Sequence, residues 1–254
     1  MSFIISTKAE MIKTRRSASF WLSIAGAGVI PLIAFLAYVI KPQQSYSQSW
    51  DTHLLQGWQV FNSFLLPMFV ILICSLIPQI EYKNNTWKQV FASPQSIGSI
   101  FFSKFLTILI MISFLFLLFN FFLLLSAVIP NLFYSKFGFL NSSIDWKNLL
   151  KLNFKTFVSL LAIISLQYWL SLRFRNFIVS IGIGLAFLIT AIIIYQLGWE
   201  HIYKVPYALP ILTVQGIRND GATLLQNHEL NSIGYFIFFT LLAFLDMRFR
   251  KERG

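Results

Sequence analysis

The sequence predicts an all-α polytopic membrane protein with six transmembrane helices, an N-terminal interfacial helix and a short cytoplasmic helix. Six long apolar runs contain no Asp, Glu, Lys or Arg, and nearly all charges lie in the segments between them. Of the 254 residues, 57% are hydrophobic and 28 are Phe, whereas only 11% are charged. Hydrocarbon offers no water to backbone polar groups, so a spanning segment is a helix or a barrel strand, and runs this long favour helices.

The six runs are long enough to cross a bilayer, which takes roughly 17–25 residues in a helix. They are Ser19–Ile40, Leu54–Ile80, Phe105–Ile129, Thr156–Leu172, Asn176–Trp199 and Leu230–Leu245. The corresponding spans are expected at about 19–40, 58–80, 105–129, 156–172, 176–199 and 230–247. The last run is the shortest, so its span must either include Asp246 and Met247 near the interface or be slightly thin for the bilayer. Residues 1–254 are expected to form a single transmembrane domain.

The first eighteen residues are expected to form a separate amphipathic helix. Its wheel places Ile4, Ile5, Ala9, Met11 and Ile12 towards one side and Ser6, Glu10, Lys13 and Thr14 on the other. Such a helix lies in the membrane surface, where Lys8 and Arg15 can extend their ammonium and guanidinium groups to the headgroups. The alternative is a frayed basic tail that only sets the orientation.

Basic residues in the segments between the runs predict the orientation, because segments rich in Lys and Arg stay cytoplasmic. One set of segments holds 13 basic and four acidic residues, a net charge of +9, and the other holds seven against five. Both termini are therefore expected in the cytoplasm. The overall charge of +11 follows from topology and from attraction to anionic lipids, so it gives no reason to expect a nucleic-acid partner.

Several kinds of chemistry find no support in the sequence. It has no phosphate-binding loop, no G-x-S-x-G and no H-E-x-x-H motif, so we predict no catalytic and no metal-binding residue. The three histidines, His53, His201 and His228, fall in outer segments and are expected to be solvated. Cys74 lies within the second run and is expected to be a small buried side chain. No apolar run carries an acid or a base, which argues against ion-coupled transport.

The segment from Glu81 to Gln95 contains a short helix pattern on the cytoplasmic side, within 82–94. Asn85 or Thr86 can cap its N-terminus, and Ser93-Pro94 ends it. Trp87, Val90 and Phe91 recur at the spacing of one helix face. Taken locally, the same aromatic residues also suit a connector that is anchored at the interface.

This segment and the basic N-terminal stretch together resemble the membrane subunits of type-2 ATP-binding-cassette (ABC) exporters. The matching motifs are confined to residues 8–22 and 81–104, and the nearest members are antimicrobial-peptide or lantibiotic immunity permeases and drug-efflux permeases. The resemblance implies that Glu81 ends the second span and that a coupling helix docks on an ATPase subunit. The residues assigned to this docking are Glu81, Thr86, Trp87, Lys88, Gln89, Phe91 and Pro94. The chain has Asn85 where the family often has Gly, and Val90-Phe91-Ala92 where it has a Leu-rich stretch.

The resemblance also implies partners and a cellular location. A cytoplasmic ATP-binding-cassette ATPase would supply ATP and Mg²⁺, and a second permease subunit, identical or related, would complete the pore among membrane lipids. The complex would lie in a bacterial cytoplasmic membrane and export a hydrophobic or amphipathic cargo by alternating access, as in antibiotic resistance or immunity.

By analogy with the family, the second and fifth spans line the path of the cargo. Candidate lining residues are Asn62, Ser63, Met68, Ser180, Thr190 and Gln196, each of which could instead be a polar helix-packing group. The outer segment 200–229 either re-enters the outer leaflet or forms an ordinary interfacial loop. Three other classes stay open: an ATP-independent secondary transporter or channel, a membrane scaffold, and an intramembrane enzyme.

Overall fold

The computed structural model describes residues 3–40, 49–84, 86–92, 95–133, 139, 142–219 and 225–249. Within these ranges the chain forms helices and turns and no strand, which confirms the all-α prediction. Six helical stretches are long and apolar enough to cross a membrane: Ala18–Ile40, Trp50–Lys83, Ile97–Phe133, Trp146–Arg173, Phe177–Gln196 and Asn227–Phe249. The chain is a multi-pass membrane protein.

The order of elements along the chain follows the predicted order. The helices are α1 (Phe3–Arg15), α2 (Ala18–Ile40), α3 (Trp50–Val60), the π-helix η2 (Phe61–Leu65), α4 (Leu66–Lys83), α5 (Trp87–Ala92), α6 (Ile97–Phe133), α7 (Trp146–Arg173), α8 (Phe177–Gln196), the 3₁₀ turns η5 (Ile202–Lys204) and η6 (Pro206–Ala208), α9 (Leu209–Asn219) and α10 (Asn227–Phe249). The second span is therefore one continuous helical path through α3, η2 and α4.

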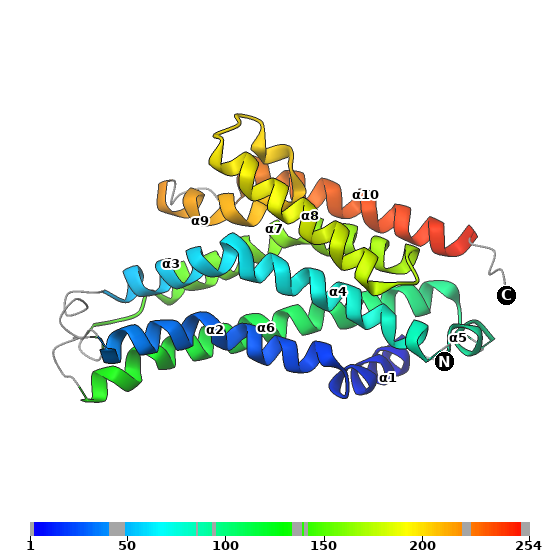
Figure 1. The fold of residues 1–254 in the computed structure, drawn as a ribbon, viewed down its shortest axis with the longest axis horizontal. Coiled ribbons are helices and arrows are strands. Elements are labelled where there is room, and N and C mark those ends of the chain that lie inside the picture. Colours follow the sequence, from blue (N-terminus) through cyan, green and yellow to red (C-terminus); the bar gives the residue numbers. More distant parts are fainter. Residues whose placement is uncertain are drawn as a thin grey trace.

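The long helices pack as an elongated bundle in which α4 and α7 are the most buried (Figure 1). α2 packs along α6, α4 contacts α2, α7 and α8, and α7 packs along α10. α8 and α10 bury few of their apolar side chains, and the others are exposed or half-buried. That exposure suits helices that face lipid or a further subunit, because apolar side chains are stable in hydrocarbon.

α1, α5 and the last turn of α10 lie at the same end of the bundle (Figure 1). We call this end the inner end, and the end where α3 and α7 begin the outer end. The arrangement agrees with two termini on one side of the membrane. The assignment of that side to the cytoplasm remains a prediction from the distribution of Lys and Arg.

Several helices extend beyond the apolar runs, and charged residues enter the bundle with them. α6 begins at Ile97 rather than Phe105, and α7 begins at Trp146 rather than Thr156. Lys155 of α7 and Glu229 of α10 are almost completely buried, with Lys155 Nζ 3.7 Å from Glu229 Oε2. The expectation of spans without acids or bases is therefore wrong for the full helices. Each apolar run was defined to end before the first charged residue. The helix itself can continue past that residue when an opposite charge pairs with it.

The expectation that the histidines are solvated is wrong for two of the three. His53 is buried, and its Nε2 donates to the carbonyl of Leu123 at 3.0 Å while its Nδ1 accepts from the Tyr38 hydroxyl at 2.7 Å. His228 is buried beside Thr213. His201 is exposed as expected. Both buried rings lie at helix ends where a hydroxyl group faces them, a tertiary contact that local sequence does not reveal.

The outer segment after α8 folds back along the bundle. Gly198 turns the chain with φ = 69°, a left-handed conformation that favours glycine. The ring of Tyr207 in η6 then lies 5.7 Å from that of Phe187, near the middle of α8, and its hydroxyl donates to Gln167 Oε1 at 2.9 Å. The segment therefore lies beside the spans rather than at their ends. Its depth in the outer leaflet remains a prediction.

Candidate functional site

The connection between α4 and α6 is ordered by hydrogen bonds from the last turn of α4. The carbonyl of Glu81 accepts from the N–H of Thr86 at 3.0 Å, and the carbonyl of Thr86 accepts from the N–H of Val90 at 3.0 Å. Thr86 thus directly precedes α5 and satisfies one of its first N–H groups. α5 is shorter than the predicted 82–94, because Tyr82 and Lys83 continue α4.

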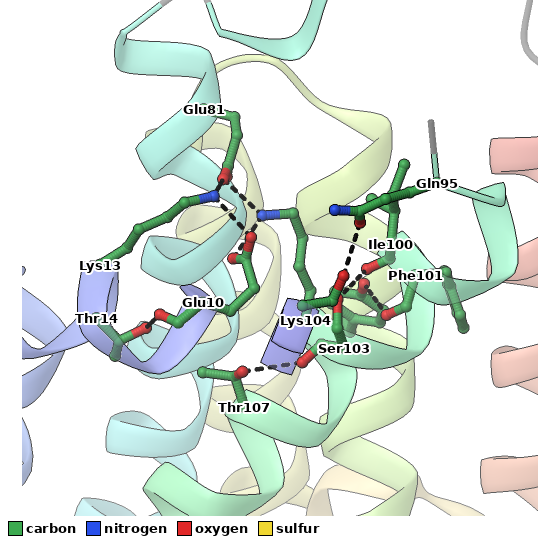
Figure 2. A network of polar contacts seen from close by, with 12 residues as sticks. Glu10, Lys13, Thr14, Glu81, Gln95, Ile100, Phe101, Ser103, Lys104 and Thr107 are labelled. Carbon is green, nitrogen blue, oxygen red and sulfur yellow. Dashed lines mark hydrogen bonds and ion pairs between the residues drawn. The ribbon is translucent and has the colours of Figure 1, made fainter. Parts of the chain in front are cut away.

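Four charged side chains meet where α1, α4 and α6 come together (Figure 2). Lys104 Nζ lies 2.6 Å from Glu81 Oε1 and 2.8 Å from Glu10 Oε2. Lys13 Nζ lies 2.7 Å from Glu10 Oε1 and 3.1 Å from Glu81 Oε1. Each lysine therefore contacts both acids, and we call these four residues the inner charge cluster.

The inner charge cluster has no net charge, and three of its residues, Glu10, Glu81 and Lys104, are buried, whereas the side chain of Lys13 is 39% exposed. The side chain of Lys104 is 0% exposed and that of Glu81 is 1% exposed. A buried charge is tolerated when it is paired and costs several kcal/mol when it is not. The two acids and two bases therefore fix the three helices relative to one another, since moving any one of them leaves a charge without its partner.

The cluster also shifts the pKa values of its two members on α1. Burial alone would raise the pKa of Glu10, but the attraction and hydrogen bond of Lys104, together with Lys13, outweigh it and lower the pKa. Burial would lower the pKa of Lys13, but Glu10 and Glu81 raise it. Both shifts favour the charged forms of Glu10 and Lys13.

Trp87, the first residue of α5, packs against the same cluster. It is only 7% exposed, its ring centroid lies 5.3 Å from that of Tyr82, and Lys104 Nζ lies 5.6 Å from the ring centroid. Tyr82 in turn donates to the carbonyl of Leu172 at 2.8 Å, which joins α4 to the end of α7. One end of α5 is therefore anchored in the bundle through an aromatic side chain and a cation.

α1 contacts the segments on both sides of α5. Ser6 donates to the side-chain oxygen of Gln95 at 2.7 Å, and Glu10 reaches Glu81 through the two lysines. The polar side of α1 is buried against the bundle, whereas Ile4, Ile5 and Ile12 are exposed. Isoleucines that face away from the protein suit a helix in the membrane surface, and that location remains a prediction.

The predicted docking residues fall into two groups. Glu81 and Trp87 are buried in the bundle, whereas Thr86 is half-buried and Gln89 is exposed. Lys88 and Phe91 belong to α5, but their side chains are outside what the structure describes, and Pro94 lies outside the described residues. The first group can position α5, and Gln89 is on the surface that a partner could contact. The docking itself remains a prediction.

The predicted cargo-path residues lie in different surroundings. Asn62 is buried and donates to Thr156 Oγ1 at 3.2 Å, and Ser180 is buried with its hydroxyl 3.2 Å from that of Ser75. These two positions fit the alternative of polar helix-packing groups. Ser63 and Met68 are half-buried, whereas Thr190 and Gln196 are exposed on α8. A path along α8 therefore remains a prediction for the assembled transporter.

Sequence reasoning did not assign Glu10, Lys13 and Lys104 to the site. The available signal was the polar side of the N-terminal helix, which carries a Glu and a Lys, and a lone lysine one residue before an apolar run. Opposite charges at such positions have to pair if the helices continue into the bundle. Neither segment alone shows that the N-terminal helix contacts Lys104.

The fold and the site define the class: a six-span, all-α membrane protein with an anchored helix at its inner end. Residues 6–191 match the model of a family described as ABC-2 family transporter protein. The match covers well over half of the chain, so the protein belongs to the ABC-2 transporter family and is a membrane permease subunit. The family implies a partnering ATP-binding subunit. No curated protein matches the chain.

The matched region contains the whole inner charge cluster and α5. It begins within α1 and ends within α8, so α9 and α10 lie outside it. The part of the chain that carries the candidate site is thus the part that the family model describes.

Proposed function

We propose that this permease subunit exports a hydrophobic or amphipathic cargo and is driven by an ATPase that docks at α5. The observation that carries the proposal is the connection of α5 to the bundle. Trp87 packs on Tyr82 and Lys104, and Lys104 bridges the acids of α1 and α4. A displacement of α5 is therefore transmitted to three helices at once.

In the proposed cycle, two permease subunits, identical or related, pair with two ATPase subunits. Binding of ATP and Mg²⁺ changes the distance between the two ATPase subunits and thereby moves both copies of α5. The permeases rock as rigid bodies, so that a cavity between them opens to one side and then to the other. The cargo changes sides without chemical change.

The cargo class follows from the surfaces that a second subunit would face. α8 exposes apolar side chains such as Phe187 and Ile189 together with the uncharged polar Thr190 and Gln196. A surface of this composition suits a peptide antibiotic, a drug or a lipid rather than a small ion. Immunity to an antimicrobial peptide and general efflux are both uses of such an exporter.

The first test is purification of the tagged chain from its native membrane in mild detergent. We expect a stoichiometric ATPase that carries a phosphate-binding loop. Absence of any ATPase, under conditions that keep other membrane complexes intact, would contradict the proposal and favour an autonomous carrier or a scaffold.

The second test examines α5 in the reconstituted complex. We expect Gln89→Ala to weaken stimulation of the ATPase by the permease, because Gln89 is exposed on α5. The matched control is Gln56→Ala, a glutamine that is also exposed, in α3 near the outer end. Equal stimulation in both variants would exclude Gln89 from the docking surface and weaken the assignment of α5.

A further inference from the structure

An apolar groove of about 790 Å³ lies between α7 and α10 at the inner end of the bundle. Its walls include Trp169, Phe238, Leu241 and Leu245. Phe238 and Leu241 are each 57% exposed, and Leu245 is 49% exposed. The volume is in the range of pockets that hold organic ligands, and the lining is apolar except for Arg173 and Asp246.

The apolar part of the groove is shorter than one leaflet of a bilayer. Its lining residues on α10 before Asp246 run from Phe238 to Leu245. Seven steps of about 1.5 Å give roughly 10 Å. Half of a hydrocarbon core that is about 30 Å thick is longer than this. The groove can therefore hold part of a single acyl chain without reaching the other leaflet.

The inner end of the groove carries an ion pair with an excess of positive charge around it. Arg173 Nη1 donates to Asp246 Oδ1 at 2.8 Å, and the arginine side chain is still 54% exposed. Arg248 is exposed on the same turn of α10, and its guanidinium carbon lies 5.9 Å from the ring centroid of the lining residue Phe249. Two arginines against one aspartate favour an anionic group at the point where the apolar walls end.

The groove is separate from the surfaces used in the proposed export cycle. The cargo path was predicted along the second and fifth spans, and α5 lies on the connection from α4 to α6. α10 has the smallest buried share of the six candidate spans. Its apolar surface is therefore open towards the membrane in the single subunit, where lipid is available at high concentration.

We propose that the groove between α7 and α10 binds one anionic glycerophospholipid of the inner-end leaflet. An acyl chain lies against Trp169, Phe238, Leu241 and Leu245, and the phosphate lies near Arg173. Asp246 limits the affinity, because it competes with the phosphate for the same guanidinium group. The site thereby links the composition of the membrane to the contact between the fourth and sixth spans.

The test uses quenching of tryptophan fluorescence by brominated acyl chains in vesicles that contain the full chain. The vesicles consist of phosphatidylcholine with a varied fraction of dibrominated phosphatidylglycerol, and a second series uses dibrominated phosphatidylcholine. The difference between the chain and its Trp169→Phe variant isolates the signal of Trp169. We expect phosphatidylglycerol to quench Trp169 at several-fold lower mole fraction than phosphatidylcholine.

Two substitutions at the mouth should change this preference in opposite directions. Arg173→Gln should weaken it about fivefold and Asp246→Asn should strengthen it by a similar factor, as expected for one charge beside an anionic headgroup. If the ion pair were only structural, both variants would have the same effect. The matched control is Arg15→Gln, an exposed arginine of α1 at the inner end but away from the groove.

Three results would overturn the proposal. They are equal quenching by the two lipids, equal quenching with and without Arg173→Gln, and absence of Trp169 quenching by either lipid. The last result would mean that a protein surface covers the groove.

Discussion

The inner and outer ends of the bundle both bury charged side chains, but they satisfy these charges to different degrees. At the inner end, two lysines and two glutamates make four contacts of 2.6–3.1 Å. At the outer end, Lys155 and Glu229 lie 3.7 Å apart. Among the described residues, Lys155 Nζ has no hydrogen-bond partner, and one oxygen of each buried acid also lacks one: Glu229 Oε1 at the outer end and Glu81 Oε2 at the inner end.

The difference indicates how strongly the buried charges hold the helices together at each end of the bundle. A buried charge that keeps two short partners resists displacement, because each alternative arrangement exposes or isolates it. A pair beyond hydrogen-bond distance contributes less and can separate at lower cost. The charges at the end that carries α5 therefore hold their helices in place, whereas the Lys155–Glu229 pair contributes less to the contact between α7 and α10, which also has the buried hydrogen bond from Ser232 to the carbonyl of Val158.

The largest expected effect comes from Lys104→Met. This variant leaves Glu10 and Glu81 with Lys13 as their only base, and we expect the free energy of unfolding to fall by about 3–5 kcal/mol. Denaturant titration in mixed micelles measures it. Lys83→Met, at an exposed lysine close to the cluster, is the control and should change stability by less than about 0.5 kcal/mol. Similar losses in both variants would contradict the role of the cluster.

A smaller loss is expected at the outer end. Lys155→Met should lower the free energy of unfolding by about 1–3 kcal/mol, because it leaves the buried Glu229 with weaker compensation. The double variant Lys155→Met with Glu229→Leu should recover most of this loss, since apolar side chains often replace a buried pair at little cost. Lys147→Met, at an exposed position of the same helix, is the control. A loss as large as that of Lys104→Met would abolish the distinction between the two ends.

Acid should weaken the inner end through Glu10. Its folded-state pKa is lowered from 4.5, so its contribution to stability is fully present above pH 4.5 and is lost as the pH falls through the lower folded value. The unfolding temperature, measured from pH 7 down to pH 3, should decline most steeply below pH 4.5. Glu10→Gln should reduce this decline. An identical pH profile in the variant would show that other carboxyl groups are responsible.

The smallest effect on stability is expected at the surface of α5. Gln89→Ala should change the free energy of unfolding by less than about 0.5 kcal/mol, because the side chain is exposed. Trp87→Ala should cost about 3 kcal/mol or more, since a buried aromatic side chain is removed next to Lys104. Comparison of the two unfolding curves separates the anchored side of α5 from its open side. Equal stability of the two variants would place Trp87 at the surface.

The sequence was sufficient for the six spans, their order and the short helix after the second span. Long uncharged runs carry that information directly, because the bilayer requires a minimum length. The helix ends were less predictable: the run that begins at Phe105 belongs to a helix that begins at Ile97. Lys104 can enter this helix because Glu10 and Glu81 neutralise it, and these residues are 94 and 23 positions away in the sequence.

The candidate site was predictable only in part, for the same physical reason. The pattern from Glu81 to Gln95 indicated the position of α5, and its length came out shorter because α4 continues through Lys83. The burial of Trp87 depends on Tyr82 and Lys104, which lie in two other helices. A local amphipathic pattern shows which residues share a face. It does not show whether that face contacts the protein, the membrane or a partner.

The length of α6 has a mechanical consequence. Its 37 residues form a rod of about 55 Å, whereas the hydrocarbon core of a bilayer is about 30 Å thick. The helix therefore extends beyond the hydrocarbon, and Lys104 lies in its inner segment. Because α6 is one continuous helix, a tilt of this inner segment also tilts the membrane-spanning segment, with no loop between them. The contacts of Lys104 with Glu10 and Glu81 hold the inner segment against α1 and α4.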